Sequence, residues 1–138
     1  MTSNNEKFPV TNKQAARIVQ GLHTEVLVSG FKDKIFVVVT QYGRIGSLIN
    51  TTFDIPPNLA RSPSTVPTTS KFLMNSAATE LSDLYLLYAA SVSRAIATSN
   101  PRESRPVVLG IALKDTGDIQ KRKELYENIM EMIRDTIA

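Results

Sequence analysis

Two short stretches of this 138-residue chain would be apolar on both faces of a β-strand. Ile35–Val39 reads Ile-Phe-Val-Val-Val, and Val107–Leu113 reads Val-Val-Leu-Gly-Ile-Ala-Leu. A strand with one solvent face alternates apolar and polar residues, so both stretches belong in the middle of a sheet that is covered on each side. A Gly43–Gly46 turn follows the first stretch and leads into another strand pattern, Ser47–Phe53. The pattern predicts a central β-hairpin.

Weaker strand patterns flank the central hairpin. Residues 14–20 form a weak apolar pattern, and His23–Ser29 alternates, with Val26 and Val28 on one face. Because short polar turns join these segments to the central strand, we expect an antiparallel meander. A further short strand is predicted at Lys71–Met74.

Two amphipathic helices complete the expected elements. Apolar residues between Ala77 and Thr98 recur at spacings of three and four, as on one face of a helix. Asp118 is a good N-cap for a last helix, although Lys121–Lys123 occupy the first turn, where the helix dipole favours carboxylates. We therefore expect one α+β domain over residues 1–138, with a mainly antiparallel five- to six-stranded sheet.

The helices cannot cover all of the expected apolar surface. Two helices, each about 10 Å wide, cover only one face of such a sheet. The second face would then stay apolar and exposed, as association surfaces do, so we expect a dimer formed through this face. The candidate contacts are outward-facing residues of the central strands, Val38, Thr40 and Ile111, with the register open by one residue.

Two polar segments interrupt the pattern. Residues 1–9 carry no periodicity and are expected to form a flexible arm. Residues 54–70 hold four of the seven prolines together with many serines and threonines. We interpret this second segment as a long exposed loop that is disordered, with a binding function as the alternative.

Composition narrows the compartment and the classes of partner. The chain has no cysteine, which excludes disulfides, zinc–thiolate sites and cysteine nucleophiles. It shows neither a membrane-length apolar run nor a secretory signal, so we expect it in the cytoplasm or the nucleus. The net charge is +3, but the basic residues are scattered, and the densest cluster, Lys121–Lys123, is followed by acidic residues. A nucleic-acid-binding module with a basic sheet face is therefore the alternative rather than the main hypothesis.

No catalytic pattern is present in the sequence. The single histidine, His23, lacks the partners that a metal site or a catalytic base needs. No serine lies in a Gly-x-Ser-x-Gly elbow. The Gly43–Gly46 segment lacks the Gly-Lys-Ser/Thr ending of a phosphate loop and precedes a strand instead of a helix. We expect a protein that is not an enzyme and that holds no cofactor or metal.

Three segments, taken together, resemble the proteasome assembly chaperone 3 family. Phe36–Ile49 reads Phe-Val-Val-Val-Thr-Gln-Tyr-Gly-Arg-Ile-Gly-Ser-Leu-Ile and resembles the signature of that family. Gly21 with Thr24–Val28 is similar to the strand before the signature, and Val107–Asp115 resembles the late strand that ends in Lys-Asp. The segments occur in the family's order, and the resemblance spans about residues 13–135.

The resemblance implies a non-catalytic chaperone of 20S proteasome α-ring assembly. It implies a dimer with the similarly folded assembly chaperone 4 or with a second copy, and both pairings stay open. It further implies that the dimer binds proteasome α-type subunits, notably alpha-type 5, and is released before the particle matures.

The Gly43–Gly46 turn supplies the candidate client contacts. An exposed turn that offers an aromatic residue and an arginine has the composition of an interface hot spot, so we expect Tyr42 and Arg44 to contact a client. The 54–70 loop is a further candidate. Packing of Tyr42 against the neighbouring strand is the alternative. A third functional hypothesis is a regulatory domain that binds a small molecule on the apolar sheet face.

Overall fold

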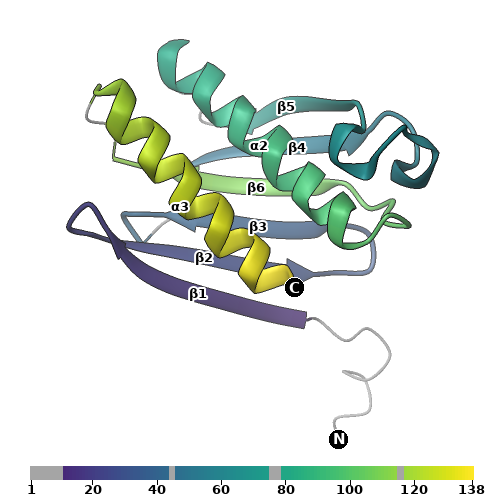
Figure 1. The fold of residues 1–138 in the computed structure, drawn as a ribbon, viewed down its shortest axis with the longest axis horizontal. Helices are drawn as coiled ribbons and strands as arrows, with labels where there is room; N and C mark the ends of the chain where they lie inside the picture. Colours follow the sequence, from purple (N-terminus) through teal and green to yellow (C-terminus); the bar gives the residue numbers. More distant parts are fainter. Residues whose placement is uncertain (1–10, 44–45, 75–78, 115–116) are drawn as a thin grey trace, which may run out of the picture.

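The computed structural model describes residues 11–43, 46–74, 79–114 and 117–138, which form a layer of strands and a layer of helices (Figure 1). The arm expected at residues 1–9 lies outside the described residues. The expected α+β class is confirmed. The elements are β1 (Thr11–Val19), β2 (Leu22–Gly30), β3 (Ile35–Thr40), β4 (Ser47–Phe53), β5 (Thr68–Met74), α2 (Thr79–Ser99), β6 (Val107–Ala112) and α3 (Ile119–Ile137).

The two stretches that are apolar on both faces, β3 and β6, occupy the centre of the sheet. The strand order is β1-β2-β3-β6-β4-β5, and β3 and β6 run parallel, with Val37 opposite Leu109. All other neighbouring strands are antiparallel. The predicted β3–β4 hairpin is wrong, because β6 lies between these two strands. The central positions remove the most apolar surface from water, and the two most apolar strands occupy them.

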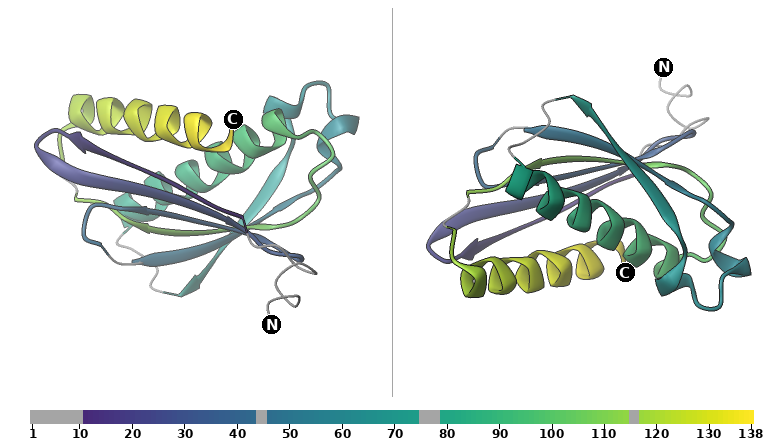
Figure 2. Two further views of the ribbon diagram at one scale, coloured as in Figure 1. Left: turned by 90° about the horizontal axis from the view of Figure 1, so that it is seen from below. Right: turned by 90° about the horizontal axis from the view of Figure 1, so that it is seen from above.

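Both helices pack on the same face of the sheet (Figure 2). α2 crosses β4, β5 and β6, whereas α3 lies over β1 and β2. The side chains of β3 that point toward the helices, Ile35, Val37 and Val39, are buried. The larger fully buried side chains of this core are Val26, Ile49, Tyr88, Val92, Leu109, Ile111, Ile129, Met132 and Ile133.

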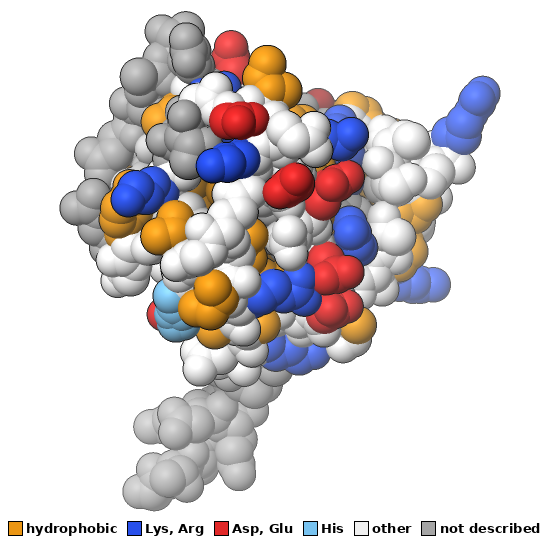
Figure 3. Space-filling view, turned by 60° about the vertical axis from the view of Figure 1, so that its left-hand side comes forward, with side chains coloured by type: hydrophobic (Ala, Val, Ile, Leu, Met, Phe, Trp, Pro, Cys, Tyr) orange, Lys and Arg blue, Asp and Glu red, His pale blue; other side chains and the backbone are white. Residues whose placement is uncertain are grey.

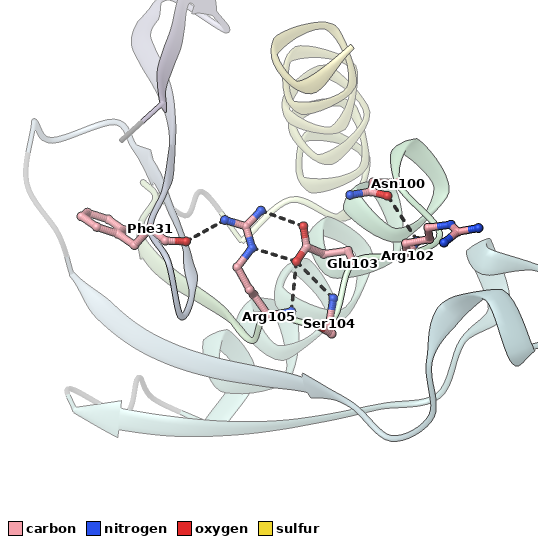
Figure 4. A network of polar contacts seen from close by, with 6 residues as sticks. All are labelled: Phe31, Asn100, Arg102, Glu103, Ser104 and Arg105. Atoms are coloured by element: carbon pink, nitrogen blue, oxygen red, sulfur yellow. Dashed lines mark hydrogen bonds and ion pairs between the residues drawn. The ribbon is translucent and has the colours of Figure 1, made fainter. Parts of the chain in front are cut away.

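An ion pair between a buried carboxylate and a partly exposed arginine holds the loop after α2 against the turn between β2 and β3 (Figure 4). Glu103 is 6% exposed, and its carboxylate accepts hydrogen bonds from Arg105 Nε and Nη2, each at 2.8 Å. Arg105 Nη1 donates to the Phe31 carbonyl oxygen at 2.7 Å. Nearby, the Ile35 N–H donates to the Pro106 carbonyl oxygen at 2.9 Å. These bonds bring the start of β6 beside the start of β3.

The segment between β4 and β5 is a closed, ordered loop, so the expectation of disorder over residues 54–70 is wrong. The Asp54 N–H donates to the Pro67 carbonyl oxygen at 2.9 Å and joins the two ends of the loop. Val66 is fully buried, and its carbonyl oxygen accepts from Arg94 Nε of α2 at 3.0 Å. Prolines begin its two 3₁₀ turns, Pro57–Leu59 and Pro63–Thr65. β5 already begins at Thr68, inside the range that was expected to be loop.

Candidate functional site

The face of the sheet opposite the helices carries a patch of partly exposed apolar side chains. Alternation places the even-numbered residues of β3 and β6 on this face, because their odd-numbered neighbours are buried under the helices. Phe36 of β3 lies opposite Val108 of β6. We call Leu27, Phe36, Val38, Leu48 and Val108 the open-face patch; all five are intermediate in exposure.

The open-face patch is continuous across four strands. Val38 lies opposite Leu27 of β2 and Gly110 of β6, and Gly110 lies opposite Leu48 of β4. Gly110, which has no side chain and is buried, lies between Val38 and Leu48 in this row. Apolar surface of this kind, uncovered by any helix, is typical of a face that another chain covers.

The same face has a hollow that overlaps the patch at Leu27 and Val38 and extends toward β1. The hollow has a volume of about 490 Å³. Its apolar lining includes Ala16, Leu27 and Val38. His23 and Glu25 add polar groups, with His23 Nε2 3.8 Å from Glu25 Oε1. The open face therefore combines an apolar strip with a shallow depression.

The three residues predicted for the dimer interface have different environments in the structure. Val38 lies in the centre of the open-face patch. Thr40 lies on the same face but is only 4% exposed, and its Oγ1 accepts a hydrogen bond from the Tyr42 N–H at 3.0 Å. Ile111 is fully buried under the helices, so the expectation that it faces outward is wrong. Its neighbours Gly110 and Ala112 occupy the open face instead, a shift of one residue.

Of the predicted client contacts, only Tyr42 falls within the described residues. Its side chain is 50% exposed, beyond the end of β3. Arg44 lies outside the described residues. The 54–67 loop lies at the other end of the sheet, beside the C-terminal half of α2 (Figure 1). The structure therefore does not bring Tyr42 and this loop together.

Four residues of the open-face patch escaped the sequence-based prediction: Leu27, Phe36, Leu48 and Val108. Each alternates with a buried neighbour, but alternation alone does not say which set faces the helices. The signal that identifies them is the cross-strand pairing of β2, β3, β6 and β4, which requires the strand order.

Metal-binding clusters and membrane-spanning helices are absent from the described residues. These residues contain no cluster of His, Asp or Glu side chains able to hold a metal ion. Among them, no helix is long and apolar enough to cross a membrane. On the side of the molecule drawn in Figure 3, Lys and Arg side chains are interspersed with Asp and Glu. A surface that tracks phosphates would gather basic residues on one face.

An α+β subunit with one covered and one apolar face is typical of proteins that act by pairing with other chains. A sequence model of the family described as proteasome assembly chaperone 3 matches residues 37–136. The chain belongs to this family.

Three relatives are similar in sequence to this chain over most of its length. Proteasome assembly chaperone 3 of Mus musculus is 30% identical over 129 residues, 94% of each chain. The protein of the same name from Homo sapiens is 30% identical over 125 residues, 91% of each chain. That of Nematostella vectensis is 31% identical over 107 residues, 75% of each chain.

A solved structure shares the fold. One chain of a chaperone complex for yeast 20S proteasome assembly superposes with a TM-score of 0.58 at 14% sequence identity. The match covers 93% of this chain and 99% of that chain. At this identity the likeness concerns the fold alone.

Proposed function

We propose that the chain is a non-catalytic chaperone that promotes assembly of the α-ring of the 20S proteasome. The observation that carries the proposal is the family match over residues 37–136, which runs from within β3 to within α3. The family carries the description proteasome assembly chaperone 3, and the open-face patch, which no helix covers, supports an action through binding of other chains.

In this proposal the open-face patch binds another chain of the same fold. The partner is either a second copy or assembly chaperone 4. The patch has an apolar centre, while Gln14, Glu25 and Asn50 lie on neighbouring positions of the same face. An apolar centre with a polar rim is the usual anatomy of a protein interface.

The proposed clients are proteasome α-type subunits, in particular alpha-type 5, in the cytoplasm or the nucleus. Tyr42 and Arg44 stay the predicted contacts at the β3–β4 turn. Because the chaperone has to leave before the particle matures, we expect the client interface to be smaller and more polar than the dimer interface.

Purification of the tagged chain from its own cells tests the function. We expect mass spectrometry of the co-purified material to identify α-type subunits and a second chaperone chain, without mature particles. Recovery of nucleic acid alone, or of a monomer with a bound metabolite, would contradict the proposal.

The Arg44→Glu variant tests the predicted client contact. We expect it to lose the α-type subunits while it keeps the dimer, as measured by size-exclusion chromatography with light scattering. An unfolded variant would instead indicate a structural role for the turn.

A further inference from the structure

A groove runs between the C-terminal halves of α2 and α3, on the helical side of the molecule and opposite the open-face patch. Its volume is about 500 Å³. The side chains that give it an apolar lining are Ala95, Tyr126, Met130 and Ile137. The ends of the helices meet where Ser99 Oγ donates to the Ile137 carbonyl oxygen at 3.4 Å.

The helices that form the groove are held in fixed positions. Tyr126 Oη of α3 donates to Ser91 Oγ of α2 at 2.6 Å. The Tyr126 ring also packs on Tyr88, with ring centroids 5.2 Å apart. Arg94 connects α2 to Val66 of the 54–67 loop, and Ser64 of this loop lines the groove. The groove is therefore a preformed feature of three packed segments.

Two arginines line the groove, and no acidic side chain of the described residues does. Arg94 uses its Nε to hold Val66, and its Nη groups make no hydrogen bond within the described part of the chain. Arg134 has no side-chain partner among the described residues. The planar guanidinium group donates in a fork that matches a carboxylate.

We infer that this groove binds an acidic segment of a client protein, with an apolar side chain inserted between the helices and carboxylates bound to Arg94 and Arg134. Two cations beside an apolar trough complement an apolar side chain that is flanked by Asp or Glu. The groove lies between the C-terminal halves of α2 and α3. Tyr42 follows the C-terminal end of β3, and this end of β3 points away from the C-terminal ends of the two helices (Figure 1). The groove is therefore separate from the predicted contact at Tyr42. It is thus a second client contact, and its assignment to an α-type subunit rests on the proposed function.

A methyl-labelling experiment tests the groove without any knowledge of the client. The chain has four methionines. Met130 is 4% exposed and lines the groove, whereas Met132 is 2% exposed and does not line it. The ¹³C-methyl signals of the intact chain are followed while a pentapeptide is added that has a central leucine and two acidic residues on each side. We expect the Met130 methyl to shift and the Met132 methyl to stay.

Charge variants sharpen this titration. We expect Arg94→Gln/Arg134→Gln to weaken binding roughly tenfold or more, because each lost bond joins two charged groups. The matched control, Lys121→Gln/Lys123→Gln, neutralises two exposed charges at the other end of α3 and keeps the shift. If Arg94→Gln disturbs the fold through Val66, the single Arg134→Gln variant gives the same comparison. No shift at Met130, or an equal shift with a lysine-flanked peptide or in the double variant, would overturn the inference.

The same variants are compared for capture of a recombinant α-type subunit. Capture that is lost in Arg94→Gln/Arg134→Gln and kept in the lysine control supports the inference. Equal capture by both would overturn the inference and leave the proposed function in place. A Met130 response to the acidic peptide without capture of the subunit by the unaltered chain would count against the proposed function alone.

Discussion

At the scale of single residues, Glu103 stands out because its carboxylate is buried and accepts four hydrogen bonds. Besides the two bonds from the Arg105 side chain, it accepts the backbone N–H of Ser104 at 3.1 Å and of Arg105 at 3.0 Å. The hydrogen bonds from the Arg105 side chain hold the pKa of Glu103 below its ordinary value, although burial acts in the opposite direction. Glu103 thus fixes the position of Arg105, which in turn connects the segment before β6 to the β2–β3 turn through Phe31.

Glu103→Gln keeps the shape of the side chain but removes its charge. We expect the free energy of unfolding to fall by about 1 to 3 kcal/mol, because an amide cannot accept both Arg105 bonds and leaves a donor unpaired. Chemical denaturation measures the change. Glu131→Gln serves as the control: Glu131 pairs with Arg17 at 2.7 Å but its side chain is 59% exposed, so the expected loss is about 0.2 to 1 kcal/mol. Equal losses at the two sites would contradict the structural role of Glu103.

The pair also makes stability depend on pH. The pKa of Glu103 is lower in the folded protein than in the unfolded chain, so its contribution is complete above the unfolded pKa of about 4.3. It is lost as the pH falls through the lower, folded pKa. We expect the difference in unfolding free energy between the unaltered chain and Glu103→Gln to stay constant from about pH 7 to about pH 5 and to shrink as the pH falls further to about 3. A difference that also stays constant below about pH 5 would contradict the prediction.

Gly46 is a second residue whose identity the packing explains. A Cβ atom at this position would lie 2.7 Å from the Ile111 carbonyl oxygen and 2.8 Å from Ala112 Cβ. Gly46→Ala should therefore displace the start of β4 from β6 and cost about 1 to 3 kcal/mol, as overpacking does. Gly117→Ala is the comparison, because its cost is backbone strain at a positive φ of 78°, with nothing within 4 Å of the added Cβ atom. Thermal unfolding measures both losses, and hydrogen exchange in β4 and β6 should accelerate only in Gly46→Ala.

At the scale of elements, the first turns of α3 carry positive side chains, which the positive N-terminal end of the helix dipole disfavours. The first turn has no acidic residue and includes Lys121 and Arg122, and Lys123 follows directly. Asp118 compensates by accepting the N–H groups of Gln120 at 2.9 Å and Lys121 at 3.2 Å. One capping side chain thus offsets the repulsion between three cations and the positive end of the helix dipole.

Removal of this cap tests its contribution. We expect Asp118→Ala to lower the unfolding free energy by about 1 kcal/mol, and Asp118→Asn to lower it by less, since the amide oxygen still accepts the N–H groups. Hydrogen exchange of the first turn of α3 should accelerate in the alanine variant. Equal exchange in the two variants would mean that charge, and not the hydrogen bonds, carries the effect.

At the scale of the whole molecule, the sheet has a helical layer on one face only. The open-face patch is therefore the surface on which the proposed dimer depends. A buried interface of this type excludes unpaired charge, because an ionised carboxylate loses several kcal/mol when it leaves water without a partner.

Val38→Asp places such a charge in the centre of the patch. We expect association with a second copy or with assembly chaperone 4 to weaken at least about tenfold, as measured by light scattering and by titration of the partner. Leu59→Asp makes the same kind of change at a leucine that is 71% exposed in the 54–67 loop, and association should persist. Dissociation of both variants, or of neither, would exclude the open-face patch as the dimer interface.

The sequence by itself determined the type and approximate position of the secondary-structure elements. The signals are local: alternation and turn residues mark strands such as β2, and spacings of three and four mark α2 and α3. It also indicated that β3 and β6 are apolar on both faces and that the chain resembles its family. These properties depend on residues that are close together in the sequence and on composition, so the sequence alone is enough to recognise them.

Only the tertiary structure decided which strands are neighbours and which faces they present. The insertion of β6 between β3 and β4, the inward face of Ile111, and the closure of the 54–67 loop by Val66 all depend on contacts between residues far apart in the chain. Such contacts compete with one another for the same apolar surface, and no local pattern ranks them. The open-face patch and the groove between the helices follow from the outcome of that competition.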